Sequence, residues 1–195
     1  MRELVHLEGK YCILEEIQPK YFSYVVEWRN NPKLNKYLNQ PFELTLELEK
    51  KWYEEIYLND LTQGLCIVID KQNMKPFGTT GFTDLDTEKK CCIGGRLLLG
   101  DESYSNHPAF LESFFIGTDN IYNIIDVMYA HVVKKNRKAL QINKMFGFIP
   151  NTGEIQYPQE LHRNGHDQIE LYRTKERYLE IREKLFDRLG ETLFT

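Results

Sequence analysis

The segment that most constrains the fold of this chain is residues 132–148, VVKKNRKALQINKMFGF. It begins with apolar residues typical of a strand, and Asn136 then stands where the chain turns into a short helix. Gly147 ends that helix, because glycine adopts the left-handed cap conformation without the steric penalty of a Cβ atom. The segment therefore predicts a strand, an asparagine-led turn and a capped helix in direct succession.

Hydrophobic periodicity and turn residues divide the rest of the chain into further elements. Strands are expected at 11–17, 65–69, 77–85, 91–99 and 124–133, and in a hairpin over 161–172 that turns at Asn164-Gly165. Helices are expected after Pro19, from Thr45 to near Asn59, from Pro108, and over 175–189 with Gly190 past the end.

Two of these elements carry more detailed expectations. Thr45 is the expected N-cap of the second helix, whose apolar face is predicted to hold Leu48, Trp52 and Ile56 at four-residue spacing. The glycine pair 94–95 inside the strand at 91–99 predicts a bulge, because paired glycines in a strand commonly mark one.

Length and charge limit the class of protein. A chain of 195 residues is expected to form a single domain over 1–195. The net charge is −4 and the basic residues are scattered, so nucleic acid is not an expected partner. No run approaches the roughly 20 apolar residues that span a bilayer, and no signal peptide is apparent. A soluble, cytoplasmic protein without a membrane partner is expected.

The cysteines and histidines do not predict a metal site. The four cysteines lie in apolar or β-like segments without a C-x-x-C pair, so buried free thiols are expected. His162 and His166 flank the predicted hairpin turn, where an ion-pair ladder is favoured over metal binding.

The order of elements and the segment 132–148 together resemble the GNAT superfamily of acyl-CoA N-acyltransferases, whose signature reads N-x-x-A/S-x-x-x-x-x-K-x-G-F. The resemblance implies an α/β (α+β) fold with a mixed, mostly antiparallel sheet, splayed fourth and fifth strands, and flanking helices. Residues 27–38 (EWRNNPKLNKYL) and 45–53 (TLELEKKWY) look most like the branch of ribosomal-protein N-terminal and amino-sugar nucleotide acetyltransferases.

The resemblance also implies where an acyl-CoA cosubstrate binds. In this family the backbone amides of the fourth strand hold the pantetheine, and Leu97, Leu98 and Leu99 occupy those positions. A glycine-rich loop normally cradles the pyrophosphate. Here both loop glycines are replaced, by Asn106 and Pro108, so the loop is degenerate. The positions expected to bind the cofactor in this altered loop are Ser105, Asn106, His107, Ala109 and Phe110. Asn136 occupies the position of the family asparagine that contacts the cofactor arm.

The residues for catalysis depart from the family pattern. Asn143 stands where the family often has a tyrosine acid, and an amide cannot donate a proton as an acid does. Asp84 and His131 are the candidates for proton transfer, with Glu112 among the alternatives. An aspartate that closes a strand is also a common turn residue, and a strand histidine is also a common core side chain.

The sequence thus predicts an N-acyltransferase that uses acetyl-CoA or another acyl-CoA and no metal. The expected acceptor is a primary amine on an amino-sugar nucleotide or a similar small molecule, with Trp28, Arg29 and Asn30 lining the acceptor wall. A protein N-terminal or side-chain acetyltransferase is the first alternative, and a catalytically inactive GNAT-like binding module is the second. A homodimer is possible.

Overall fold

The computed structural model describes residues 5–38, 40–153, 155 and 167–193. The predicted hairpin turn at Asn164-Gly165 and both of its histidines, His162 and His166, lie outside these residues. None of the helices among the described residues combines the length and the apolar character that a membrane span requires.

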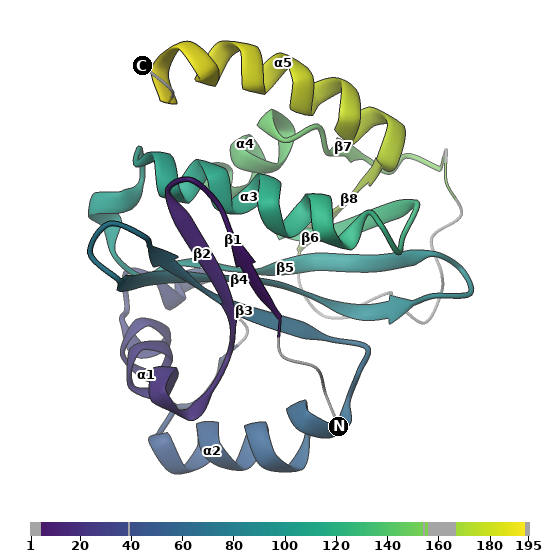
Figure 1. Ribbon diagram of the computed structural model, residues 1–195. Helices are drawn as coiled ribbons and strands as arrows, with labels where there is room; N and C mark the ends of the chain where they lie inside the picture. The colour runs from purple at the N-terminus through teal and green to yellow at the C-terminus, as the bar shows by residue number, and fades with distance from the viewer. Residues whose placement is uncertain (1–4, 39, 154, 156–166, 194–195) are drawn as a thin grey trace. The chain divides into compact units, whose positions relative to one another are not determined.

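The described residues form a mixed α/β structure, as predicted (Figure 1). The helices, including four short 3-10 turns, are η1 (Pro19–Tyr21), α1 (Phe22–Asn30), η2 (Asn35–Tyr37), α2 (Leu46–Glu55), η3 (Tyr57–Asn59), η4 (Glu102–Tyr104), α3 (Pro108–Ile121), α4 (Arg137–Met145) and α5 (Lys175–Leu193). The strands are β1 (His6–Glu8), β2 (Cys12–Glu16), β3 (Gly64–Asp70), β4 (Lys75–Asp86), β5 (Cys91–Leu99), β6 (Val127–Val133), β7 (Ile149–Pro150) and β8 (Gln168–Thr174). Their order in the sheet is β1-β2-β3-β4-β5-β6-β8-β7, with β5 and β6 parallel.

The chain divides into two compact units. Unit 1 comprises Met1–Thr83 and Gly95–Ile121, and unit 2 comprises Asp84–Gly94 and Tyr122–Thr195. Strands β4 and β5 therefore each run from one unit into the other. The single domain expected from the chain length stays a prediction.

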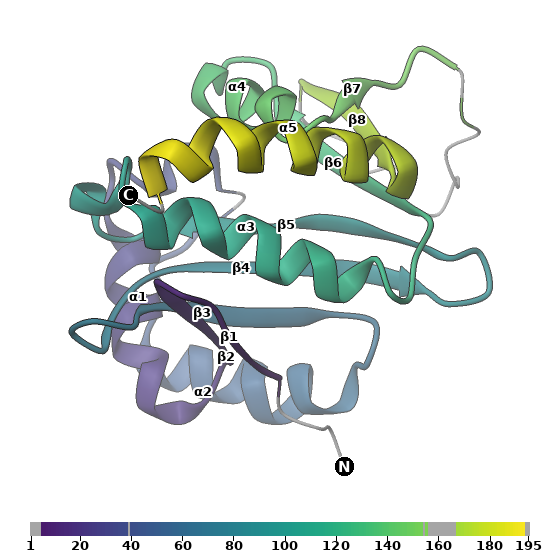
Figure 2. The same ribbon diagram turned by 45° about the horizontal axis from the view of Figure 1, so that its top comes forward.

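In unit 1, alternation along the strands builds two separate cores. Side chains of β2 and β3 at odd positions, such as Ile13 and Ile67, pack with α1 and α2, whereas Leu14 and Val68 pack with α3. Figure 2 shows α1 and α2 on one face of the unit 1 strands and α3 on the other. Each face of these strands is thus covered by helix.

Helix α2 begins as predicted but buries a different face. The Thr45 hydroxyl accepts a hydrogen bond from the Leu48 backbone N–H at 3.2 Å, so the predicted N-cap is confirmed. The predicted apolar face is wrong at two of its three positions, because Leu48 is 44% exposed and Ile56 is 51% exposed, whereas Trp52 packs against the core as predicted. The buried residues of α2 are Glu49 and Tyr53. The Tyr53 ring packs against the rings of Phe22 and Tyr57 in the core.

The carboxylate of Glu112 joins α3 to the β1–β2 hairpin. Its Oε1 accepts the backbone N–H of Lys10 at 2.7 Å, and its Oε2 accepts those of Tyr11 and Cys12 at 2.7 and 2.8 Å. Hydrogen bonds from amides to a charged acceptor are stronger than neutral ones. The carboxylate that the sequence offered as a candidate for proton transfer is therefore committed to the fold.

Unit 2 is built around β6, β8 and α4. Strand β6 pairs with β8 along its whole length, from Val127 to Val133. The Asn136 side chain accepts the Ala139 N–H at 3.1 Å and Gly147 has φ of +87°, so the predicted cap and stop of α4 are confirmed. Helix α5 continues through Gly190 to Leu193, which makes the predicted end wrong.

Arg173 fills the centre of unit 2 and is only 1% exposed. Its guanidinium donates to the Phe146 carbonyl at 2.7 Å and to the Tyr122 hydroxyl at 3.1 Å, and it lies against the rings of Phe148 and Tyr178. The carbonyl belongs to the C-terminal end of α4, where a positive charge is favourable. Arg173 therefore fastens α4 to β8.

We predict that Glu112→Ala destabilises the protein by roughly 3 kcal/mol, because three amides lose a charged acceptor at once. Urea unfolding measures the effect. Glu54→Ala is the matched control, since the Glu54 carboxylate is exposed and lies 3.8 Å from Lys50. Equal stability of the two variants would contradict the role assigned to Glu112.

Candidate functional site

Strand β5 contains a left-handed residue at Arg96. Its φ is +52°, and it follows directly after the glycine pair that predicted a bulge. Neither Gly94 nor Gly95 has a positive φ, and the predicted bulge at these two glycines stays a prediction. A left-handed conformation costs of order 1 kcal/mol and persists only where the surroundings fix it.

The surroundings of Arg96 hold both its backbone and its side chain. The Thr79 hydroxyl donates to the Arg96 carbonyl at 2.6 Å. The guanidinium donates to Gln63 Oε1 and lies 5.4 Å from the ring centre of Trp52. Gln63 in turn donates to Asp60 Oδ2 at 2.6 Å. The left-handed residue is thus tied to β4 and to the segment between η3 and β3.

The strand residues after Arg96 are those expected to bind pantetheine. Leu97 and Leu99 pack toward the core beneath α3. A Cβ atom on Gly78 would lie 2.5 Å from the Leu98 carbonyl oxygen, so β4 requires glycine there. In unit 2, the parallel ladder of β5 with β6 joins only Cys91–Ile93 to Val127–Tyr129. The amides of residues 97–99 are therefore not part of that ladder.

The loop after β5 bonds mostly to itself. The Ser105 N–H donates to Glu102 O at 3.1 Å, and the His107 N–H donates to Tyr104 O at 3.0 Å. The Ala109 N–H donates to His107 Nδ1 at 3.2 Å, and the Phe110 N–H donates to His107 O at 3.0 Å. A pyrophosphate on the two α3 amides would have to displace the His107 ring and carbonyl. Binding at Ser105, Asn106, His107, Ala109 and Phe110 stays a prediction.

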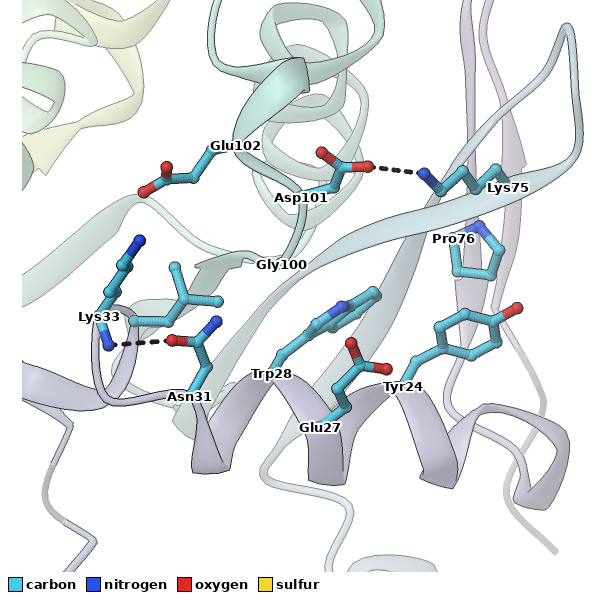
Figure 3. A pocket seen from close by; sticks show the side chains of 11 residues that line it. Tyr24, Glu27, Trp28, Asn31, Lys33, Lys75, Pro76, Gly100, Asp101 and Glu102 are labelled. Carbon is cyan, nitrogen blue, oxygen red and sulfur yellow. Dashed lines mark hydrogen bonds and ion pairs between the residues drawn. The ribbon is translucent and has the colours of Figure 1, made fainter.

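Trp28 of the predicted acceptor wall lines a pocket of about 480 Å³ in unit 1 (Figure 3). The other lining residues are Tyr24, Glu27, Asn31, Lys33, Leu34, Lys75, Pro76, Gly100, Asp101 and Glu102. Lys75 Nζ lies 2.7 Å from Asp101 Oδ2, and this contact with the hydrogen bonds from Ser103 lowers the pKa of Asp101 to about 2. The pocket wall thus carries a Lys75–Asp101 ion pair.

The other two residues of the predicted wall are placed differently. The Asn30 amide donates to the Leu44 carbonyl at 2.7 Å and accepts the Leu44 N–H at 2.9 Å, so it fixes the segment before α2. Arg29 does not line the pocket but acts electrostatically on Glu49 and Arg96. The sequence did not point to Glu49, because α2 is rich in charged residues that look like a solvated surface.

The remaining candidates belong to unit 2. The Asn143 side chain donates to the Ala139 carbonyl at 2.9 Å, one turn earlier in α4. His131 lies in β6 opposite Glu170, and Asp84 has φ of +56° in β4. Catalytic roles for Asp84, His131 and Asn143, and a cofactor contact for Asn136, stay predictions. Within the described ranges, no three His, Cys, Asp or Glu side chains are grouped to hold a metal ion.

Comparison with solved structures identifies the fold. Similar structures include a GCN5-related N-acetyltransferase from Brucella melitensis, with a TM-score of 0.73, 16% identity, and 93% and 84% of the two chains covered. The nucleotide-linked sugar GNAT FdhC matches with a TM-score of 0.72, 17% identity, and 93% and 96% covered. The spermidine N-acetyltransferase from Vibrio cholerae, in complex with CoA and spermine, matches with a TM-score of 0.68 and 17% identity. The match covers 88% of this chain and 99% of that structure.

The chain has the GNAT fold. No family model and no curated protein matches the sequence. The predicted mixed sheet with flanking helices is therefore confirmed at the level of the fold.

We predict that Gly100→Ala disturbs the pocket, because its Cβ atom would lie 2.2 Å from Trp28 Cδ2. Overpacking of this kind costs roughly 1–3 kcal/mol in urea unfolding. Gly95→Ala is the matched control, since no atom lies within 4 Å of a Cβ atom at that position. If Gly100→Ala unfolds like Gly95→Ala, the close packing of Gly100 on Trp28 is not required.

Proposed function

We propose that the protein is an acyl-CoA-dependent N-acyltransferase that acetylates a primary amine on a small molecule. The observation that carries this proposal is the left-handed Arg96 in β5 of a GNAT fold, followed directly by Leu97, Leu98 and Leu99. In the family that the sequence resembles, amides at these positions hold the pantetheine and polarise the thioester carbonyl. Preorganised N–H donors stabilise the oxyanion that develops during acyl transfer.

We favour an amino-sugar nucleotide as the acceptor. A protonated amine cannot attack a thioester, and an amine with a pKa near 10.4 is only about 0.04% neutral at pH 7. A sugar amine is usually less basic, so it makes a smaller demand on a general base. The N-terminal segment 27–38 supports the same choice through its resemblance to sugar-modifying members.

Two other functions remain as alternatives. Transfer to a protein N-terminus or side chain is supported by the resemblance to ribosomal-protein acetyltransferases. A binding module without activity is supported by the loop at 104–110, in which Pro108 has no N–H and the Ala109 amide is already bonded to His107. Binding of acetyl-CoA separates an enzyme from such a module.

We predict that acetyl-CoA binds in calorimetric titration, and that replacing Asn106 and Pro108 together by glycine tightens binding about tenfold or more. The replacement restores one N–H, and a hydrogen bond to a charged group contributes roughly 1.5–3 kcal/mol. Pro41→Gly, at an exposed position outside this loop, is the control for general loosening of the chain. Weaker or unchanged affinity of the double variant would mean that the loop binds through other contacts.

We also predict that a panel of acceptors with acetyl-CoA gives turnover on a nucleoside-diphosphate amino sugar and little on spermidine or a peptide. Release of free thiol measures the rate. Preferred acetylation of the peptide would select the protein-acetyltransferase alternative. Absence of both turnover and acetyl-CoA binding would select the inactive binding module.

A further inference from the structure

The pocket of about 480 Å³ in unit 1 is walled by α1 and by the segment that follows β5 (Figure 3). On α1 it is lined by Tyr24, Glu27 and Trp28, since residues three and four positions apart share one face of a helix. Across the pocket, the Gly100 backbone packs so closely on the Trp28 ring that a Cβ atom there would lie 2.2 Å from Trp28 Cδ2. The volume falls within the range of small-molecule sites, about 300–1,000 Å³.

Hydrogen bonds fix the pocket wall that follows β5. The N–H groups of Gly100 and Asp101 both donate to the Phe77 carbonyl, at 2.8 and 3.0 Å. Asp101 Oδ2 also lies 2.7 Å from Lys75 Nζ. Gly100 follows directly after Leu99, the last of the three residues whose amides are assigned to the pantetheine. The pocket therefore borders the proposed acyl-donor segment through a backbone that is held in place.

The indole N–H of Trp28 is a donor without a hydrogen-bond partner among the described residues. Trp28 is only 5% exposed, yet its N–H is not one of the sealed polar atoms in that part of the chain, which are Gln40 Oε1 and Glu49 Oε1. Since Trp28 lines the pocket, its N–H is open to a ligand there. A donor in such a buried side chain is expected to find an acceptor.

Three charged side chains of the pocket lining also lack partners among the described residues. Lys75 and Asp101 neutralise each other, whereas Glu27, Glu102 and Lys33 form no side-chain hydrogen bond or ion pair in the described ranges. Two free carboxylates against one free ammonium group disfavour a diphosphate in the pocket. A polyamine would satisfy the carboxylates, but it would leave the indole N–H and the lysine without acceptors.

A sugar ring matches both kinds of free group. A hydroxyl group donates one hydrogen bond and accepts others, so it fits carboxylates on one side and an N–H on the other. Hydrogen bonds to ionised carboxylates are stronger than neutral ones. The C–H face of a sugar is apolar, and the Tyr24 ring, 37% exposed and centred 5.7 Å from the Trp28 ring, offers it an aromatic surface.

We propose that the pocket binds the sugar ring of the acceptor, with Glu27 and Glu102 accepting hydrogen bonds from its hydroxyl groups and the Trp28 N–H donating to it. The nucleoside diphosphate stays outside the pocket. This inference rests on the proposed N-acyltransferase function and names the part of the acceptor that the pocket recognises. Glu27 and Glu102 are then residues that determine acceptor specificity.

Tryptophan fluorescence measures this binding without acetyl-CoA. The chain has two tryptophans, so Trp52→Phe leaves Trp28 as the only emitter. We expect glucosamine or galactosamine to change the Trp28 emission saturably, and UDP and spermidine to leave it unchanged. A saturable response to UDP or spermidine, or none to either amino sugar, overturns the inference. If Trp52→Phe does not fold, calorimetric titration of the wild type with the two amino sugars decides, and absence of binding overturns the inference.

Substitution of the two glutamates tests their role. We expect Glu27→Gln and Glu102→Gln each to weaken amino-sugar binding about tenfold, because each removes a charged acceptor. Each should also raise KM for a nucleoside-diphosphate amino sugar with little change in kcat, as expected when only binding is lost. Glu43→Gln, which changes an exposed glutamate outside the pocket, is the matched control and should bind as the wild type does. Unchanged affinity in both pocket variants contradicts the assignment.

The outcomes separate this inference from the proposed function. If the wild type acetylates a nucleoside-diphosphate amino sugar, but neither pocket variant raises KM and neither amino sugar changes the Trp28 emission, the pocket is not the sugar site and the proposed function stands. If the amino sugars bind in the pocket while acetyl-CoA is neither bound nor consumed, the sugar site stands and the proposed function fails.

Discussion

The left-handed backbone at Arg96 is the constraint on which the candidate site depends. A residue with a side chain adopts this conformation at a cost of order 1 kcal/mol, so the protein must hold it in place. It does so with the Thr79 hydroxyl on the carbonyl, and with Gln63 and Trp52 on the guanidinium. The strained residue stands between the segment of β5 that pairs with β6 and the segment assigned to the acyl donor.

Two charged side chains of the described residues, the half-buried Glu112 and the buried Arg173, are satisfied by backbone and aromatic groups. Glu112 accepts three amides of the β1–β2 hairpin, and Arg173 donates to a helix-end carbonyl inside a cage of aromatic rings. Each arrangement compensates the desolvation of one charge with groups from distant parts of the sequence. Glu49 Oε1 has no hydrogen-bond partner of this kind among the described residues.

The sequence predicted those features of the fold that depend on local chemistry. The caps at Thr45 and Asn136 and the stop at Gly147 follow from side-chain acceptors and from the freedom of glycine, and all three are present. The predicted end of α5 before Gly190 was wrong, because a glycine weakens a helix without always ending it. Strand β1 was not predicted, since its three residues, HLE, are too short and polar to show a pattern.

The site could be predicted only where single residues carry a signal. Trp28 was expected in the acceptor wall and lines a pocket, whereas the burial of Glu49 has no signature in a helix that reads LELEKKWYEE. Which face of α2 is covered depends on α1 and β3, and a local four-residue spacing fits several faces equally well. Once that packing is known, a glutamate that looks like surface becomes a buried acceptor without a donor. The setting of such a residue therefore arises from the tertiary fold, because only the fold shows that its Oε1 is buried without a partner among the described residues.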